Sequence, residues 1–515
     1  MTTIEPEKIH KALVDLRAEG YDFLRSLTGM DWGEEGLGVV YHIEKTSTGE
    51  NKVVKTVTAN RENPELPSVC DIWKAAEFNE REVYDFFGIH FIGHPDMRRL
   101  YLREDWIGHP FRKDYDESLN PLRMTNEEPD DVTHYYEELP DGSVIEKRDI
   151  LFDEDEYIIN IGPQHPATHG VLRFRVSLEG EIIKKLDVHC GYIHRGIEKM
   201  CESLTYPQTL ALTDRLDYLG AHQNRHALCM CIEKAMGIEV SDRVQYIRTI
   251  MDELQRIDSH LLFFSCLCMD LGALTAFFYG FRDREKILDI FEATTGGRLI
   301  QNYNTIGGVQ YDIAPDFVQK VKEFIAYLRP MLREYHEVFT GNVIANGRLK
   351  GVGILNREDA ISFGATGGTG RASGWACDVR KRHPYAMYGK VDFKEIIRTE
   401  GDCFARYMVR MEEIMESMNI IEQLIDNIPE GPFQEKTKAI IKVPEGNYFA
   451  AVEGRRGEFG VFLESRGDKY PYRLKFRSTG LPLVSIKETV CRGAKIADLI
   501  AIGGTVDYVV PDIDR

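Results

Sequence analysis

Two histidines stand in a stretch whose residue types suit a ligand site. His165 and His169 lie within residues 162–173, which read Gly-Pro-Gln-His-Pro-Ala-Thr-His-Gly-Val-Leu-Arg. The prolines and glycines of this stretch predict an irregular, extended backbone. A strand-like run with alternating apolar residues follows directly. The sequence therefore predicts a titratable imidazole in a loop at the mouth of a sheet, where side chains meet a ligand.

The ten cysteines predict no metal centre. No Cys-x-x-Cys occurs, and the two close pairs, Cys229/Cys231 and Cys266/Cys268, fall in helical patterns. Residues two apart on a helix point to different faces, so these pairs are poor chelates. We therefore predict reduced, buried thiols and no iron–sulfur cluster held by this chain.

Three histidines of the first part also predict no metal site. His90 and His94 lie close together in the sequence, and His109 follows in a second turn-like stretch. No carboxylate or thiol pattern in the sequence completes a site around them. They are interpreted as part of a partner-binding surface.

Charge and hydropathy narrow the class of protein. The 515 residues carry a formal net charge of −19, which argues against nucleic acid as a partner because phosphate binding needs a basic surface. The N-terminus has no basic start followed by an apolar run, so export is not predicted. Residues 261–281 are almost wholly apolar, but Asp270 near their middle costs about 2.5–3.5 kcal/mol in a membrane. We predict a break between two helices there and membrane association through partners only.

The first part of the chain, to about Tyr115, is predicted to be a small α+β domain. It combines a short amphipathic helix around Leu13, strands over 38–44 and 52–58, and a helix over 73–87. Residues 116–156 are rich in acids, contain three prolines and lack apolar periodicity, which predicts a linker.

The second part is predicted to be a helical bundle capped by sheet elements at both ends. It opens with strands over 171–178 and 182–188, and a long helix begins after Ser241 as N-cap. Apolar stripes predict a further helix kinked at Pro330 and another over 404–424. After Glu435 the pattern predicts short strands and glycine turns.

Several blocks resemble subunits of respiratory complex I, the proton-pumping NADH-quinone oxidoreductase. The run 88–95, continued by 98–100 and 106–115, resembles the C subunit, whereas the second part resembles the D subunit. The blocks that carry the second resemblance are 162–173, 189–199, 370–374 and 455–460. The chain is thus similar to the fused C/D subunits of some bacteria. The resemblance implies a C-like domain over 1–115, an acidic linker over 116–156 and a D-like domain over 157–515. It also implies an α+β fold whose D-like part is like the large subunit of nickel–iron hydrogenases.

The resemblance implies a site for quinone reduction. His169 and Tyr218 match the two quinone-facing residues of the family, and Asp270 matches the aspartate that pairs with the histidine. Reduction of a quinone needs two electrons and two protons, delivered at carbonyl oxygens on opposite sides of the ring. An imidazole donates near neutral pH, a phenol is a good hydrogen-bond donor, and a nearby carboxylate favours the protonated imidazole.

The resemblance also implies a surface that faces the terminal iron–sulfur cluster of the B subunit. Arg215 matches an arginine facing that cluster, and a cation there stabilises the reduced state. Ile300 stands where the family commonly has a cluster-facing histidine. Without that imidazole, we expect a cluster potential that is lower and varies little with pH. A low potential suits a low-potential quinone such as menaquinone.

The function implied is that of a peripheral-arm subunit of a proton-translocating quinone oxidoreductase, inactive alone. The implied partners are the B, I and membrane H subunits, on the cytoplasmic side of a bacterial inner membrane, with NADH or another electron donor. Hydrogenase activity is excluded because nickel needs four thiolates, and only Cys190 is even a candidate at the corresponding positions. A purely structural subunit that joins the peripheral and membrane arms is the remaining alternative.

Overall fold

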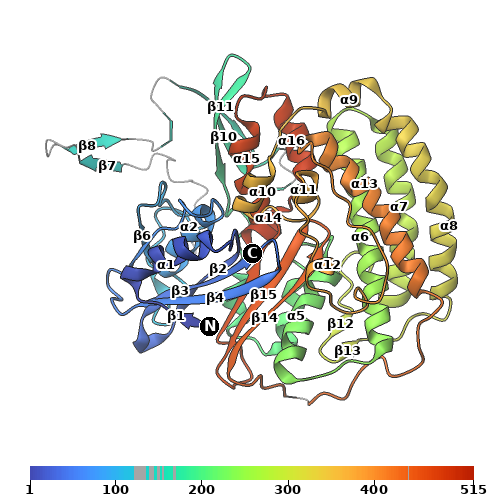
Figure 1. Cartoon of the computed structure of the whole chain (residues 1–515), viewed down its shortest axis with the longest axis horizontal. Helices are drawn as coiled ribbons and strands as arrows, with labels where there is room; N and C mark the ends of the chain where they lie inside the picture. The colour runs from blue at the N-terminus through green and yellow to red at the C-terminus, as the bar shows by residue number, and fades with distance from the viewer. Residues whose placement is uncertain (121–134, 139–143, 148–150, 153–155, 166–169, 439) are drawn as a thin grey trace.

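Helices and strands are mixed in this chain, as predicted. The structure is a computed structural model that describes residues 1–120, 135–138, 144–147, 151–152, 156–165, 170–438 and 440–515. In Figure 1 the N-terminal sheet lies on the left and the long helices lie on the right, with strands and short helices between them. The predicted site residue His169 lies outside the described residues.

A four-stranded sheet forms the N-terminal part, and α1 (Pro6–Ala18) and α2 (Ala76–Phe87) pack against it. Its strands, in the order β1-β4-β3-β2, are β1 (Thr2–Thr3), β2 (Phe23–Asp31), β3 (Leu37–Lys45) and β4 (Glu50–Thr58). The predicted helices and β3 and β4 are confirmed to within a few residues. The sequence pattern does not predict β2, because all of its residues are buried, including polar ones such as Arg25.

Small pairs of strands lie outside the main sheets. The parallel pair is β5 (Glu65–Pro67) and β6 (His90–Ile92), and the antiparallel pairs are β7 (Tyr135–Glu138) with β8 (Val144–Lys147) and β12 (Asn304–Thr305) with β13 (Gly308–Val309). The hairpin β7–β8 falls inside the segment predicted to be a linker, so that segment contains regular secondary structure that its composition does not indicate.

The predicted hairpin after the histidine stretch is confirmed and belongs to a three-stranded antiparallel sheet. Its strands are β9 (Tyr157–Ile161), β10 (Arg173–Glu179) and β11 (Ile182–His189), with β10 in the centre. The polar face of β10 is buried as well, since Arg175 and Ser177 are both nearly inaccessible. Here Arg175 stacks over the ring of Phe152 at 4.7 Å.

Long helices form the bundle that positions the predicted site. The four longest are α6 (Asp242–Asp270), α7 (Leu274–Thr295), α8 (Phe317–Tyr335) and α13 (Cys403–Leu424), which lie side by side in Figure 1. Ser241 caps α6, as predicted, by accepting a hydrogen bond from the Val244 N–H. The helical structure is interrupted between Asp270, where α6 ends, and Leu274, where α7 begins. Helix α8 contains Pro330. The predicted break between two helices and the predicted helix around Pro330 are therefore confirmed, whereas the kink stays a prediction.

Shorter helices connect the bundle to the sheets. They are α3 (Ile197–Cys201), α4 (Tyr206–Thr213), α5 (Ala221–Met236), α9 (Val343–Leu349), α10 (Arg357–Phe363), α11 (Gly367–Ala372) and α12 (Val379–Arg382). A π-helical turn, His336–Thr340, extends α8.

The C-terminal region is only partly as predicted. The strands after Glu435 are confirmed as an antiparallel sheet of β14 (Gly446–Gly454), β15 (Gly457–Ser465) and β16 (Arg473–Arg477). The rest of the region is helical, with α14 (Gly480–Ser485), α15 (Lys487–Cys491), α16 (Asp498–Val506) and α17 (Val510–Asp514). The prediction of strands to the end was wrong because these helices are short and almost wholly buried, so they show no polar face.

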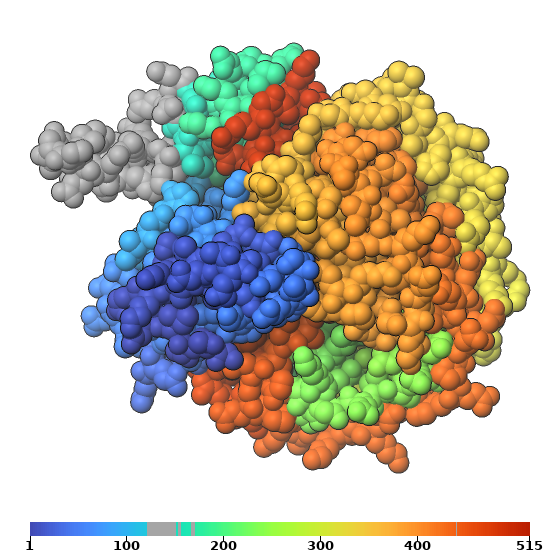
Figure 2. All heavy atoms as spheres, viewed as in Figure 1, coloured from blue at the N-terminus to red at the C-terminus, as the bar shows by residue number. Residues whose placement is uncertain are grey.

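One continuous hydrophobic core runs through both parts of the chain, from Ile9 to Ile513. Buried ion pairs add to it. Arg25 on β2 donates to Glu458 on β15 at 2.7 Å, and Glu82 on α2 contacts both Lys475 and Arg515. Figure 2 shows the blue N-terminal part in direct contact with the orange and red later segments. The two parts are therefore packed as one body.

Candidate functional site

Tyr218 lies in the turn between α4 and α5, directly after Asp217. Its side chain is half-buried, and burial raises the pKa of the phenol while the guanidinium of Arg456 opposes that rise. A phenol with a raised pKa keeps its proton at neutral pH, so Tyr218 is in the state needed to donate a hydrogen bond.

Asp270 is the last residue of α6 and packs against the backbone of α16. A Cβ added to Gly504 would lie 3.1 Å from Asp270 Oδ2, so a glycine at this position leaves room for the carboxylate. One turn earlier on α6, burial raises the pKa of the Cys266 thiol to about 11, and the charge of Asp270 adds to the rise.

Cys266 is a shared neighbour of the two predicted site residues. The charge of the Cys266 thiolate contributes to the raised pKa of Tyr218. The charge of Asp270 in turn contributes to the raised pKa of Cys266. Tyr218 and Asp270, which are far apart in the sequence, therefore both lie near the C-terminal end of α6. Their part in one site stays a prediction.

A cavity of about 270 Å³ opens beside His165, the first histidine of the Gly/Pro-rich stretch. Phe174 from β10 and residues at the start of α16, among them Leu499 and Ile500, line it. Since α16 also contacts Asp270 through Gly504, this helix connects the wall of the cavity to the carboxylate. The apolar lining suits the ring or tail of an apolar ligand.

Buried ion pairs hold the turn that carries Tyr218. Arg456 donates to Asp217 at 3.0 Å and to Asp507 at 2.8 Å, and Arg455 also contacts Asp217. Arg410 lies 3.4 Å from Asp507. All five side chains are nearly inaccessible. Burial raises the pKa of Asp217, and Arg456 counteracts this.

The roles of these charged residues were not predicted from the sequence. Asp507 stands in an otherwise apolar run, Val506 to Val510, and adopts a left-handed φ of 59°. A charge inside an apolar run is a signal of a buried ion pair, because an unpaired charge is costly there.

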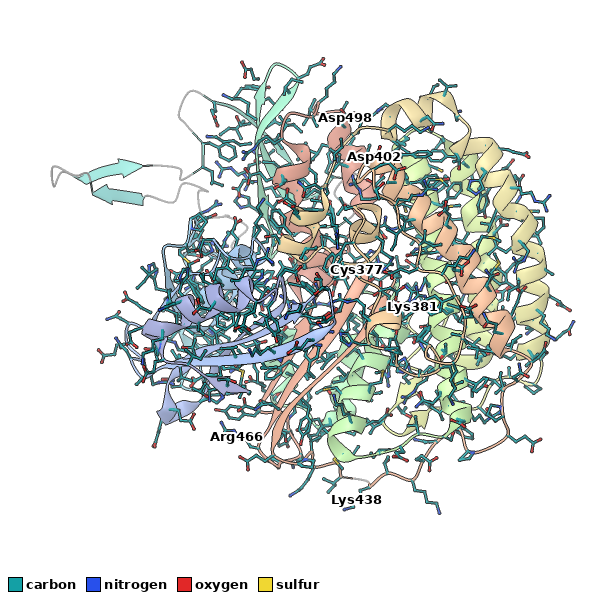
Figure 3. The ribbon with its side chains drawn as sticks, viewed as in Figure 1. Cys377, Lys381, Asp402, Lys438, Arg466 and Asp498 are labelled. Atoms are coloured by element: carbon teal, nitrogen blue, oxygen red, sulfur yellow. The ribbon has the colours of Figure 1, made fainter. Side chains whose placement is uncertain are left out.

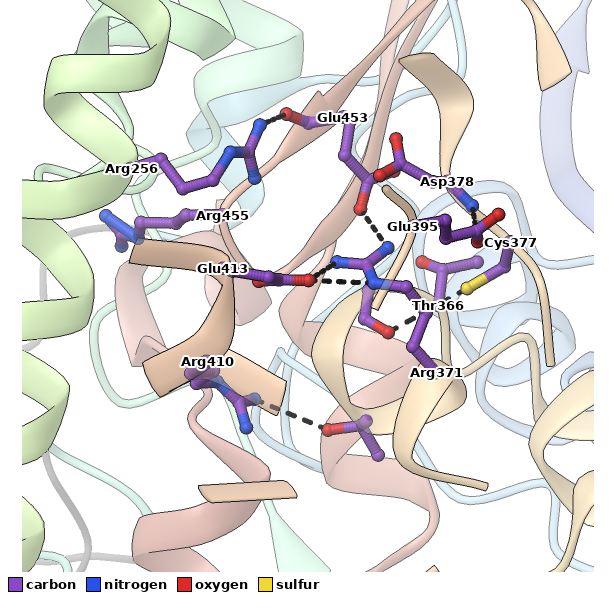
Figure 4. Close-up of polar contacts among 12 residues, drawn as sticks. Arg256, Thr366, Arg371, Cys377, Asp378, Glu395, Arg410, Glu413, Glu453 and Arg455 are labelled. Atoms are coloured by element: carbon purple, nitrogen blue, oxygen red, sulfur yellow. Dashed lines mark hydrogen bonds and ion pairs between the residues drawn. The ribbon is translucent and has the colours of Figure 1, made fainter. Parts of the chain in front are cut away.

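A second layer of ion pairs is centred on Arg371, as Figure 4 shows. The guanidinium of Arg371, which is wholly buried, contacts Glu413 at 2.6 Å and Glu453 at 2.7 Å. His260 lies 2.9 Å from the other oxygen of Glu413. Because α6, α11, α13 and β14 each supply a member, this layer fixes their relative positions.

The predicted cluster-facing residues are at the surface. Arg215 is exposed, and neighbouring Arg195, also exposed, donates to its carbonyl oxygen at 2.6 Å. Within the described part of the chain, neither arginine has a carboxylate within ion-pair distance. Ile300 is half-buried in the loop after α7, next to the exposed Leu299. Two uncompensated cations form a surface suited to an anionic group on a partner.

The N-terminal part contains a cluster of possible metal ligands that was not predicted from the sequence. The side chains of Cys70, Glu80 and His94 each offer a ligand atom, all within 4.8 Å of one another. However, His94 Nδ1 accepts the Asp96 N–H at 2.9 Å, and Nε2 lies 3.0 Å from the Glu77 carbonyl oxygen. Both nitrogens are in use, so the imidazole has no lone pair to offer a metal in this arrangement.

Comparisons with known proteins decide the family. Residues 2–120 match the family model "Respiratory-chain NADH dehydrogenase, 30 Kd subunit", and residues 270–442 and 437–515 match "Respiratory-chain NADH dehydrogenase, 49 Kd subunit". The NADH-quinone oxidoreductase C/D subunit of Phocaeicola vulgatus is 86% identical over 513 residues, which cover 99% of each chain. This chain belongs to the fused C/D subunits of NADH-quinone oxidoreductase.

Relatives of the second part alone are also found. The NADH-quinone oxidoreductase D subunit of Geobacillus kaustophilus is 44% identical over 366 residues, which cover 71% of this C/D subunit and all of that protein. A chain from a solved structure of the membrane-bound sulfane sulfur reductase, an archaeal respiratory membrane complex, is 34% identical with a TM-score of 0.68. It matches over 71% of this subunit and all of that chain.

No helix in the described part of the C/D subunit is both long enough and apolar enough to cross a membrane. The apolar segment around Asp270 is divided between α6 and α7, whose ends Asp270 and Leu274 flank the break.

Proposed function

We propose that the D-like part of this subunit forms the quinone-reduction site of a proton-translocating oxidoreductase. The observation that supports the proposal is that Tyr218 and Asp270 both lie near Cys266 at the end of α6, and that α16, which packs against Asp270, also lines the apolar cavity beside His165. The cavity offers an apolar surface to a quinone, and the two side chains offer a hydroxyl and a carboxylate to its polar groups. His169, four residues after His165, is proposed as the second proton donor.

The proton chemistry follows from the residue types. Tyr218 donates at one quinone oxygen and His169 at the other, while Asp270 favours the protonated form of the imidazole. Once that proton has been given to the quinone, the Asp270 carboxylate no longer has a cationic partner. This change of charge is proposed as the first step of coupling to proton translocation.

The surface that carries Arg215 and Arg195 is proposed to contact a partner subunit. Arg215 and Arg195 would face the terminal iron–sulfur cluster of a B subunit, with Ile300 nearby. An I subunit and a membrane H subunit are the other proposed neighbours, on the cytoplasmic side of the inner membrane. The D-like part is proposed to have a hydrogenase-like fold without nickel, since only Cys190 is a candidate thiolate at the corresponding positions of the sequence.

The roles of the separate parts of the chain are also proposed. Residues 1–115 would act as a structural C-like domain, 116–156 as a connecting segment and 157–515 as the quinone-site domain. A scaffold role for the whole chain is the competing hypothesis, and it is supported by the extensive buried ion pairs between the two parts.

Photolabelling of the assembled complex with an azido-quinone distinguishes the two hypotheses. We expect label in peptides that contain Tyr218, residues 266–270 or the start of α16, and excess unlabelled quinone should prevent it. Tyr311, whose side chain is 56% exposed, reports background labelling. Protectable label confined to other peptides or other subunits would favour the scaffold role.

Substitution of Ile300 by histidine tests the cluster-facing surface. In the wild-type complex we expect a terminal cluster potential that varies little with pH, in keeping with menaquinone as the acceptor. The I300H variant should acquire a potential that falls with rising pH by up to about 60 mV per pH unit, because reduction then takes up a proton. A redox titration followed by electron paramagnetic resonance measures this, with Ile300→Leu as control. A steep slope in the wild type would contradict the expectation.

A further inference from the structure

Lys487 at the start of α15 is a buried cation without an acidic partner among the residues that the structure describes. Its side chain is wholly buried, and its ammonium group has no hydrogen-bond partner among them. It lies over two aromatic rings, 5.2 Å from the centroid of Phe174 and 5.2 Å from that of Tyr508. Cation–π contacts compensate only part of the cost of burying an unpaired charge.

Among the groups that surround Lys487, a second cation increases this cost. The titratable groups near it are the thiols of Cys491 on its own helix and of Cys403 on α13, and the guanidinium of Arg406 on α13. Arg406 is itself a wholly buried cation that donates to the carbonyl oxygens of Gly353 and Gly401. Burial is the main reason that the pKa of Lys487 falls to about 8.

Acidic residues of α15 and of the neighbouring helices are engaged elsewhere. Glu488, the next residue on α15, pairs with Arg492. Asp402 caps α13 by accepting the Ala405 N–H at 2.7 Å and also accepts the Gly351 N–H at 2.7 Å. Asp498, at the start of α16, lies 3.9 Å from Arg348, and Figure 3 shows Asp402 and Asp498 at the same end of the molecule. None of the three carboxylates forms an ion pair with Lys487.

Two contacts connect Lys487 to the proposed quinone site. Phe174, which the ammonium group overlies, is part of the wall of the 270 Å³ cavity with His165. Tyr508, the other ring, is buried, and its hydroxyl has no hydrogen-bond partner in the described part of the chain. Its pKa is raised first by burial and further by the charges of Cys491 and Asp270. The same ring is thus close to Lys487 and to Asp270, while Cys190 also faces it.

We propose that Lys487 is a charge-compensating residue for quinone reduction, which acts across Phe174 on the cavity beside His165 and across Tyr508 on Asp270. The inference rests on the proposed function. Delivery of two protons to the reduced quinone leaves the site more negative, by one charge for each proton that its side chains give up. A fixed cation in a poorly hydrated interior stabilises that negative charge. This explains why a lysine occupies a place where a methionine of similar volume would pack at less cost.

The test compares Lys487→Met and Lys487→Gln with the wild type in the assembled complex. Two reactions are measured from pH 6 to 9.5: reduction of a short-chain menaquinone analogue, and reduction of ferricyanide, which takes electrons before the quinone site. We expect wild-type quinone reduction to fall as pH rises through about 8, as Lys487 loses its proton. Both variants should reduce quinone about fivefold to tenfold more slowly below pH 8, without that fall, and should reduce ferricyanide normally.

Stability gives a second readout and a matched control. Lys487→Met should raise the free energy of unfolding of the full chain at pH 7, because it removes an unpaired buried charge. The pKa of Lys487 is depressed, so the unfolded chain binds its proton more tightly between pH 8 and 10.5, and the gain should shrink across that window. Lys475, also buried, contacts Glu82 and lies 3.6 Å from Glu198, so Lys475→Met should destabilise the chain.

Wild-type quinone rates and pH profile in both Lys487 variants would overturn the proposal. If a Tyr218→Phe variant also kept full quinone reduction, the proposed site itself would be wrong. If only the Lys487 variants were unaffected, the site would stand and Lys487 would be a buried structural residue.

Discussion

Replacement of Arg371 by methionine is expected to prevent stable folding of the chain. Arg371 is wholly buried between Glu413 and Glu453, and it is the residue through which α11 is joined to α13 and β14. Removing the guanidinium leaves two buried carboxylates short of a partner. Breaking a buried ion pair from one side costs about 3–5 kcal/mol, a large part of the stability of a domain.

Urea unfolding of the full chain, followed by circular dichroism, measures the loss. Arg329→Met is the matched control, because Arg329 pairs with Glu422 at 2.8 Å on the surface, where such pairs contribute less than about 1 kcal/mol. Adding Glu453→Gln to Arg371→Met removes one of the two unpaired charges and should restore part of the stability. An Arg371→Met chain as stable as the control would show that this layer of ion pairs does not hold the elements together.

The elements that could be predicted are those with a simple periodicity. The stripe from Val244 to Leu261 predicts α6, and the alternation after residue 171 predicts β10 and β11, because each element buries one regular set of positions. Strand β2 and helices α14 to α17 are buried on all sides, so no polar face marks their period. Their structure depends on contacts that are distant in the sequence.

The site could be predicted only in part. The resemblance identifies Tyr218 and Asp270, and the structure places both near Cys266, but their roles stay predictions. His169 lies outside the described residues and also stays a prediction. The ion pairs of Asp217, Arg456 and Asp507 could not be predicted from spacing, because three separate segments supply them. Neither could the burial of Lys487, since a lysine is almost never fully buried unless it is paired.

Replacement of Tyr218 by phenylalanine is expected to reduce quinone reduction about a hundredfold while the complex still assembles. The change removes one oxygen, and the Tyr218 hydroxyl makes no hydrogen bond within the described part of the chain, so no buried partner is left unpaired. What is lost is the proton donor at one quinone oxygen, and a positioned acid contributes about 10²–10⁴ in rate. The measurements are quinone reduction and ferricyanide reduction by the same preparation, with the second expected to be unchanged.

Tyr206→Phe is the control for the loss of a buried hydroxyl in the same region. Tyr206 begins α4, two turns before the loop of Tyr218, and donates to Ser465 at 3.1 Å. Its removal should cost about 1 kcal/mol of stability and leave quinone reduction intact. Because both variants lose a phenolic oxygen, a decrease of quinone reduction in Tyr218→Phe alone would reflect chemistry at the quinone rather than packing. Equal rates in the two variants would mean that the phenol of Tyr218 takes no part in proton delivery, and the subunit would then be better understood as a scaffold.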